Sequence, residues 1–184
     1  MTVETSRRQF IRGAFASEAP ASAPARPRVP RPCGAAAEAV FVAACTGCGD
    51  CARACPEQMI RRDAAGLPAM DFNVSACTFC GACIEVCETD ALSPGTAWDW
   101  QAEVTASCLS ATGVQCRACE DFCETRAIRF RPQTGGRALP RIDTGACTGC
   151  GACIAPCPAG AITLIETRPA KAEATGPATE TRPC

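Results

Sequence analysis

The sequence predicts an α+β fold made of two tandem copies of one small unit, in which short strands and short helices alternate. Sixteen of the 18 cysteines fall into four groups of four. The second cysteines of these groups lie 32, 36 and 34 residues apart, at Cys48, Cys80, Cys116 and Cys150, and a period this regular indicates repeated supersecondary units. A small apolar pair follows each group at the same distance. Only 5% of the residues are aromatic, so an ordinary hydrophobic core would be thin.

The chain divides by composition into four segments. We expect a basic, Ala/Pro-rich N-terminal segment at 1–39, a first unit at 40–95, a second unit at 96–166 and a disordered tail at 167–184. Residues 13–39 are rich in Ala, Pro and Arg and are expected to be extended and mobile. Cys33 and Cys184 lie in these flanking stretches, outside the groups of four, and are expected to be spare thiols rather than ligands.

The repeated apolar pairs place the regular elements. Each pair is predicted to end a short helix and to enter a strand; the pairs are Met59-Ile60, Ala91-Leu92, Ala127-Ile128 and Ala161-Ile162. Further short strands are expected at 69–72 and 139–143, with a turn at 134–137 between strands. Trp98-Asp99-Trp100 lies between the two units and is expected to pack at their junction.

The cysteine spacing predicts the chemistry. Three groups read C-x2-C-x2-C-x3-C: Cys45, Cys48, Cys51, Cys55; Cys77, Cys80, Cys83, Cys87; and Cys147, Cys150, Cys153, Cys157. The remaining group keeps the last three positions and moves the first cysteine upstream: Cys108, Cys116, Cys119, Cys123. This spacing holds [4Fe–4S] cubanes in bacterial ferredoxins. Three [4Fe–4S] clusters are therefore expected, and the displaced third motif predicts a fourth. The two units are expected to be ferredoxin-like, of the bacterial 2[4Fe–4S] type.

Two other uses of cysteine fit the sequence less well. Disulfide scaffolds are usually short, secreted and irregularly spaced, whereas this spacing repeats. Zinc sites usually come as two separated C-x2-C pairs, often with histidine. The chain contains no histidine, and three cysteines within seven residues crowd a tetrahedral zinc ion.

In two-cluster units the fourth cysteine of one motif ligates the other cluster. Pairing neighbouring motifs joins Cys45, Cys48, Cys51 with Cys87, and Cys77, Cys80, Cys83 with Cys55. In the second unit it joins Cys147, Cys150, Cys153 with Cys123, and Cys108, Cys116, Cys119 with Cys157. The near-equal gaps favour neighbours modestly, and a first-with-fourth, second-with-third pairing remains open.

The loops around the second cysteines differ in one motif. Gly49, Gly81 and Gly151 follow that cysteine, where glycine permits unusual backbone torsions and close approach of amides to sulfur. Arg117 replaces the glycine in the third motif, and Gly113 stands where its first cysteine would be. That site is expected to be the most irregular, and could be labile or hold three irons.

Charge is distributed unevenly. The net charge is −1, but residues 1–32 carry six arginines against Glu4 and Glu18, a net of +4. A basic arm on an acidic body suits docking to an acidic partner, and a solvated tail fits equally well. Basic residues do not interleave with aromatics, so no nucleic-acid binding is expected. No run approaches the ~18 apolar residues of a membrane span, so no membrane insertion is expected.

The N-terminus contains Ser6-Arg7-Arg8-Gln9-Phe10, which looks like a twin-arginine export motif. An export signal also needs an apolar region, but the residues that follow are few, include Glu18 and are broken by Pro20. A cytoplasmic protein is therefore expected. The chain has no histidine, no P-loop and no dinucleotide fingerprint, so it is not expected to be an enzyme.

Taken together, these features resemble the NapF family, the ferredoxin-type accessory proteins of periplasmic nitrate reductase systems. The resemblance covers roughly residues 5–166. Besides the four cysteine motifs it rests on Ser6-Arg7-Arg8, Ala97-Trp98-Asp99, Phe130-Arg131-Pro132 and the displaced motif running from Cys116-Arg117 to Cys123-Glu124. It implies a cytoplasmic protein that contacts the catalytic molybdenum subunit before export and helps it to acquire or mature its own iron–sulfur cluster.

Two functional classes follow from these observations. As an assembly factor, the protein would donate a loosely held cluster or supply electrons for maturation. As a polyferredoxin electron carrier, it would hold four stable clusters as a wire. Both need the same ligands. A redox sensor is a third and weaker hypothesis, since no effector domain supports it.

Removing iron is expected to unfold most of the chain, because metal-site formation and folding are coupled when the apolar core is small. Circular dichroism of anaerobically purified protein before and after chelation measures this. A native-like spectrum from the iron-free chain would contradict the prediction.

Overall fold

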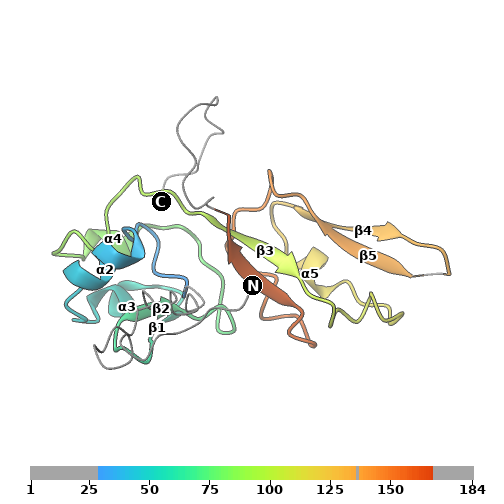
Figure 1. The fold of residues 1–184 in the computed structure, drawn as a ribbon, viewed down its shortest axis with the longest axis horizontal. Helices are drawn as coiled ribbons and strands as arrows, with labels where there is room; N and C mark the ends of the chain where they lie inside the picture. Colours follow the sequence, from blue (N-terminus) through green and yellow to red (C-terminus); the bar gives the residue numbers. More distant parts are fainter. Residues whose placement is uncertain (1–28, 136, 168–184) are drawn as a thin grey trace, which may run out of the picture.

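The computed structural model describes residues 29–135 and 137–167, which form two units arranged along the long axis of the molecule (Figure 1). The first unit contains α2 (Glu38–Ala44), α3 (Asp50–Ala54), β1 (Ile60–Arg62), β2 (Pro68–Met70) and α4 (Ala82–Glu85). The second contains β3 (Trp100–Val104), α5 (Ala118–Asp121), β4 (Ile128–Pro132), β5 (Ala138–Ile142) and β6 (Ile162–Glu166). The expected mixture of short helices and short strands is confirmed.

The two units repeat the same strand pairing. Each contains an antiparallel hairpin, β1–β2 in the first and β4–β5 in the second, with Ile60 opposite Met70 and Ile128 opposite Ile142. In the second unit β3 pairs antiparallel with β6 and so joins its two ends. In the first unit the corresponding closure is a single antiparallel bridge between Ala35 and Leu92.

Three of the four apolar pairs mark strand entries as expected. β1, β4 and β6 begin at Ile60, Ile128 and Ile162, the second residue of each of these pairs. The prediction is wrong for Ala91-Leu92, because Leu92 forms only the isolated bridge to Ala35. The first residue of the pair is buried each time, because Met59, Ala127 and Ala161 are all 1% exposed. β3 was not among the expected strands, since its pairing with β6 joins residues 58 to 66 positions apart in the chain.

The predicted helix position is wrong by a few residues. Each apolar pair is predicted to end a short helix, but α3, α4 and α5 each contain the third cysteine and end before the fourth, several residues ahead of the pair. Cys55 has an extended backbone at φ −71° and ψ 114°, because the following Pro56 disfavours the helical region for the residue before it. In the last motif the residues around Cys153 form turns rather than a helix.

The expectation of a mobile segment up to residue 39 is also wrong for its last part. Residues 31–34 are buried in the first unit. The Arg31 guanidinium donates to the Glu38 and Asp63 carboxylates, each at 2.7 Å, and lies 5.0 Å from the centre of the Phe41 ring. A buried cation needs such partners, and they attach the start of the described chain to α2 and to the β1–β2 turn.

Cys33 belongs to this correction. Cys33 is 1% exposed within the first core and is disulfide-bonded rather than a spare thiol. Cys184 lies outside the described residues, as do the arginine pair Arg7-Arg8 and the tail from residue 168. Thr167 still belongs to the folded part, since its backbone N–H donates to the Asp99 carbonyl at 2.7 Å.

The core is divided between the units. The first centres on Phe41, Met59 and Phe72, and the second on Ile128, Phe130 and Ile162. Cysteines form part of both, as expected for a chain with few large apolar residues. Ile154 and Leu164 pack against both cores and so connect them. Within the described ranges, none of the helices has the length and apolar character needed to cross a membrane.

The junction between the units is formed by the last cysteine motif and the first unit. The Cys77 N–H donates to the Cys150 carbonyl at 2.8 Å, and the Trp98 indole N–H donates to the Gly149 carbonyl at 3.3 Å. A Cβ on Gly151 would lie 2.0 Å from the Phe72 ring. Only glycine allows this approach, because Gly151 also has a φ of 79°. Trp98 therefore lies at the junction, as expected.

We expect Gly151→Ala to destabilise the iron-loaded protein more than Gly81→Ala. Both glycines follow a second cysteine and have nearly the same φ, but Gly81 has no atom within 4 Å of an added Cβ. The control therefore costs only the left-handed backbone penalty, about 1–2 kcal/mol, whereas Gly151→Ala adds overpacking of about 1–3 kcal/mol. Anaerobic thermal unfolding measures the difference. Equal shifts in Tm would show that the Phe72 contact does not hold the units together.

Candidate iron–sulfur sites

The cysteine loops of three motifs share one backbone conformation. The residues on both sides of the second cysteine are left-handed in each: Gly47 and Gly49, Phe79 and Gly81, and Gly149 and Gly151. This winding turns the loop sharply around the second cysteine. The sequence predicted the need for the second glycine of each loop, but it did not predict that Phe79 also takes a φ of 55°.

The structure brings cysteines of neighbouring motifs together in the first unit. Burial, and then the charges of Cys45, Cys48 and Cys87, raise the pKa of Cys51. Cys87 therefore lies beside the first motif rather than only beside its own.

The second motif receives the reciprocal partner. Burial raises the pKa of Cys77 to about 11, and the neighbouring Cys55 contributes first among the charges, ahead of Cys80. Burial, with Cys77 as its first charged neighbour, raises the pKa of Cys83 to about 12. The position of Cys87 beside the first motif and that of Cys55 beside the second agree with pairing between neighbouring motifs.

The third motif has the same arrangement despite its displaced cysteine. Cys108, Cys116, Cys119 and Cys157 line one apolar cavity together with Leu109, Phe130 and Ile162. Burial, followed by the charges of Cys108 and Cys157, raises the pKa of Cys119 to about 11. Cys157, from the fourth motif, thus completes the set.

The fourth motif keeps its first three cysteines together. Burial, followed by Cys150 and Cys147, raises the pKa of Cys153 to about 12. Cys123 packs against the same core and is the cysteine left over once Cys157 lies with the third motif. For the first three motifs, the structure thus places a cysteine of the neighbouring motif beside the site. For the fourth motif, Cys123 is assigned because the other cysteines are already used.

These buried thiols fit a polynuclear metal group. Thiols with pKa values of about 11 to 12 are protonated at neutral pH, so thiolates form there only if a cationic group compensates for burial and mutual repulsion. A cubane supplies one iron for each thiolate and so suits a set of four cysteines. Among residues 29–135 and 137–167, no three Cys, Asp or Glu side chains are found close enough to hold a single metal ion.

Backbone amides add to this fit at several sulfurs. The Ala161 N–H donates to Cys157 Sγ at 3.2 Å. Amide hydrogen bonds from Ala52 and Phe79 oppose the effect of burial and lower the pKa of Cys51 and Cys77 respectively. Such hydrogen bonds stabilise thiolate ligands and help to set the reduction potential of a bound cluster.

The third site is built differently around its second cysteine. Arg117 has φ −136°, not the left-handed conformation of the glycines. Its guanidinium lies 5.3 Å from the centre of the Phe130 ring and pairs with Glu120 at 3.3 Å. Ser110, 4% exposed, donates its hydroxyl to the Ala138 carbonyl and so attaches the Cys108 loop to β5. Sequence reasoning missed Ser110, because a single serine in a loop gives no signal of its partner.

Comparison with known proteins agrees with this geometry. The family described as "4Fe-4S dicluster domain" matches the chain twice, at residues 44–91 and 114–161. The second match begins after Cys108, so the displaced cysteine lies outside it. A protein named "Ferredoxin-type protein NapF" from Haemophilus influenzae is 41% identical over 169 residues, which cover 89% of this chain and 96% of that protein.

The chain belongs to the NapF family of ferredoxin-type proteins. The NapF protein of Escherichia coli K12 is 37% identical over 128 residues, 68% of this chain and 78% of that protein. The same organism's "Ferredoxin-type protein NapG" is 30% identical over 150 residues, 69% of this chain and 65% of that protein. The family resemblance inferred from the motifs is thus confirmed, as are two dicluster domains of the [4Fe–4S] type in tandem.

Paired substitutions should reveal which cysteines share a site. We expect Cys45→Ala/Cys87→Ala to leave three intact [4Fe–4S] clusters, because both residues lie at one site. Cys77→Ala/Cys87→Ala should leave two, because the same number of cysteines is removed from two sites. Mössbauer spectra of iron-57-loaded protein count the intact clusters. If each motif kept its own fourth cysteine, the two results would be exchanged. Two intact clusters in both variants would support first-with-fourth pairing.

Proposed function

We propose that the chain is an iron–sulfur accessory protein for the catalytic subunit of periplasmic nitrate reductase. It binds the unexported precursor of that molybdenum subunit in the cytoplasm and supports assembly of its [4Fe–4S] cluster. The observation that carries this proposal is the NapF relationship over 89% of the chain. It is a binding and transfer role rather than an enzymatic one.

The sixteen cysteines are the ligands in this proposal, four to a cluster. The first unit uses Cys45, Cys48, Cys51 with Cys87, and Cys77, Cys80, Cys83 with Cys55. The second uses Cys108, Cys116, Cys119 with Cys157, and Cys147, Cys150, Cys153 with Cys123. The raised pKa values and the cavity at the third motif support these sets. A bound [4Fe–4S] cluster supplies one-electron redox chemistry, and a donated one is itself the cargo.

The third site is the best candidate donor. Its loop lacks the left-handed residues that the other three share, and its first ligand reaches in from a separate segment. Its supporting contacts come from side chains, Ser110 and Arg117, rather than from the loop backbone alone. A site assembled in this way can release one ligand without unfolding the rest of the unit.

A second function, electron supply by a polyferredoxin, is favoured by the junction. The Cys77–Cys150 hydrogen bond of 2.8 Å places the second and fourth motifs side by side. The four sites then follow one another in the order first, second, fourth, third. A continuous row of this kind suits electron transfer along the molecule. Donation and electron supply use the same ligands, so the distinction needs an experiment.

Anaerobic transfer distinguishes the two functions. Holo-protein labelled with iron-57 is mixed with the apo-precursor of the catalytic subunit in the presence of a chelator, and the separated precursor is examined by Mössbauer spectroscopy. We expect labelled [4Fe–4S] in the precursor, because a cluster passed directly is protected from the chelator. A stable complex without transferred iron would instead support electron supply, and no complex at all would contradict the proposed function.

Two matched variants locate the donor site. Cys108→Ala removes a ligand from the third site, and Cys45→Ala removes one from the first. If the third site donates, Cys108→Ala should bind the precursor but transfer little label, whereas Cys45→Ala should still transfer it. The opposite pattern would assign donation to the first site.

A further inference from the structure

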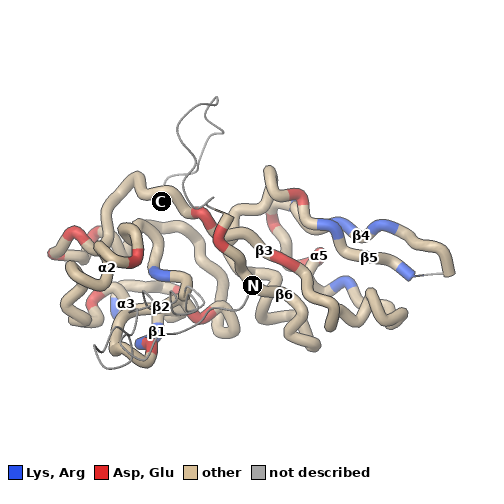
Figure 2. Tube along the Cα trace, viewed as in Figure 1, with Lys and Arg blue, Asp and Glu red and all other residues tan. Residues whose placement is uncertain are grey.

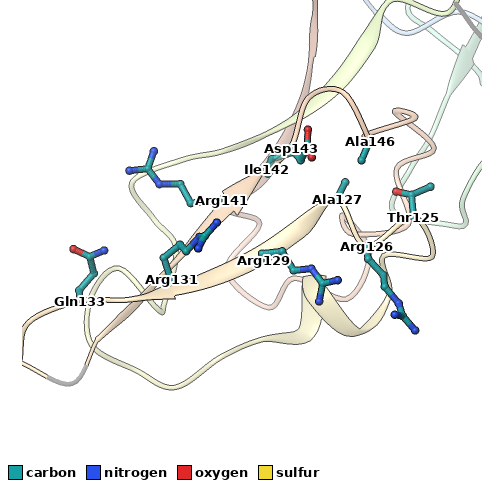
Figure 3. Close-up of a pocket in the computed structure, with 10 residues that line it drawn as sticks. All are labelled: Thr125, Arg126, Ala127, Arg129, Arg131, Gln133, Arg141, Ile142, Asp143 and Ala146. Carbon is teal, nitrogen blue, oxygen red and sulfur yellow. The ribbon is translucent and has the colours of Figure 1, made fainter. Parts of the chain in front are cut away.

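The outer face of the β4–β5 hairpin is a concentrated basic surface. Arg129 and Arg141 are directly opposite each other in the register, and Arg131 follows two positions along β4 on the same face. All three are exposed, as is Arg126 just before the strand. These four arginines and Asp143 are among the residues that line one surface pocket (Figure 3).

The alternation of β4 explains why the arginines face outward. Ile128 and Phe130 are buried at 1% and 9% exposure and pack in the core that contains Cys119 and Cys153. Because side chains alternate across a strand, the intervening arginines lie on the opposite side. The basic surface and the core that contains the cysteines of the second unit therefore lie on opposite faces of β4.

These arginines have no ion-pair partner within the described ranges. The ion pairs there involve Arg31, Arg53 and Arg117 instead. Like charges directly opposite on a sheet are destabilising, so the Arg129–Arg141 pair costs stability unless an anionic group faces it. This arrangement suits a surface whose complement lies on another molecule.

The two ends of the molecule also carry opposite net charge. Residues 125–143 carry five arginines against one aspartate, a net of +4, whereas 29–95 carry four arginines against eight carboxylates, a net of −4. Figure 2 shows the basic residues gathered on β4 and β5 and acidic residues over the first unit. The potential at the hairpin therefore attracts acidic surfaces and orients their approach.

We propose that this basic face, Arg126, Arg129, Arg131 and Arg141, is the docking surface for an acidic region of a protein partner. The inference rests on the proposed function in that the partner is the precursor of the catalytic subunit. Docking there places the partner next to the second unit, which contains the third site.

The surroundings favour protein over other anionic partners. Phe130 on β4 is buried, so the outer face of the hairpin itself offers no aromatic side chain on which a base could stack. Contact of this face with the acidic first unit of a second copy would be head-to-tail and would build rings or filaments, so self-association is one outcome of the test below.

Charge reversal tests the surface in the full-length holo-protein. The test variant is Arg129→Glu/Arg141→Glu, and the matched control is Arg61→Glu/Arg62→Glu, which makes the same change of charge at two exposed positions outside the ion pairs of the first unit. Binding to the apo-precursor is measured by biolayer interferometry at low and moderate salt. We expect the test variant to bind at least tenfold more weakly at low salt and the control to bind within about threefold of wild type. Both should keep the iron content of wild type.

The outcomes separate this inference from the proposed function. If wild type does not bind the precursor, the proposed function fails. If wild type and the test variant bind equally, the function stands and the docking surface is wrong. Loss of iron from the test variant alone would also overturn the inference, since the arginines would then stabilise the clusters.

Three further measurements test whether a membrane, a nucleic acid or a second copy of the chain binds the basic face instead. Phosphatidylglycerol vesicles and a single-stranded oligonucleotide are tested against wild type and the test variant, and sedimentation measures self-association. Binding to either probe, or a dimer, that the test variant abolishes would assign the surface to that occupant and overturn the proposal. Absence of all three, with precursor binding lost in the test variant, supports it.

Discussion

The convergence of buried cysteines from separate motifs is the constraint on which the rest of this structure depends. Each buried thiol has its pKa raised by desolvation and by its neighbours, to about 12 at Cys83 and Cys153. The short helices α3, α4 and α5 each contain the third cysteine of a motif. A chain with few large apolar side chains can fold in this way when the metal group forms part of its core.

This constraint also explains where glycine is required. The left-handed residues around the second cysteines turn the chain sharply, and two of them, Gly149 and Gly151, additionally allow Trp98 and Phe72 to approach closely. The last motif thus serves both as a candidate cluster site and as the junction of the two units. The third motif lacks these glycines and is supported by Arg117 and Ser110 instead, which gives the second unit one irregular site and one regular site.

Charge completes the functional picture. The first unit is acidic and the β4–β5 hairpin basic, so the two ends of the molecule present different surfaces to a partner. The basic face lies across one strand from the core of the second unit. The proposed docking face and the buried cysteines are therefore close in space although they lie on opposite sides of β4, an arrangement produced by the two-residue period of a strand.

By itself the sequence determined the iron–sulfur chemistry, the family and the tandem repeat of one unit. The cysteine spacing and the apolar pairs are local patterns, so they can be interpreted without the folded structure. The sequence favoured the pairing of neighbouring motifs, and the geometry supports that pairing, including Cys157 with the third motif. It did not predict β3, the buried role of Arg31 or the contact of Gly151 with Phe72. Each of those joins residues far apart in the chain, and only the folded structure decides which distant surfaces meet.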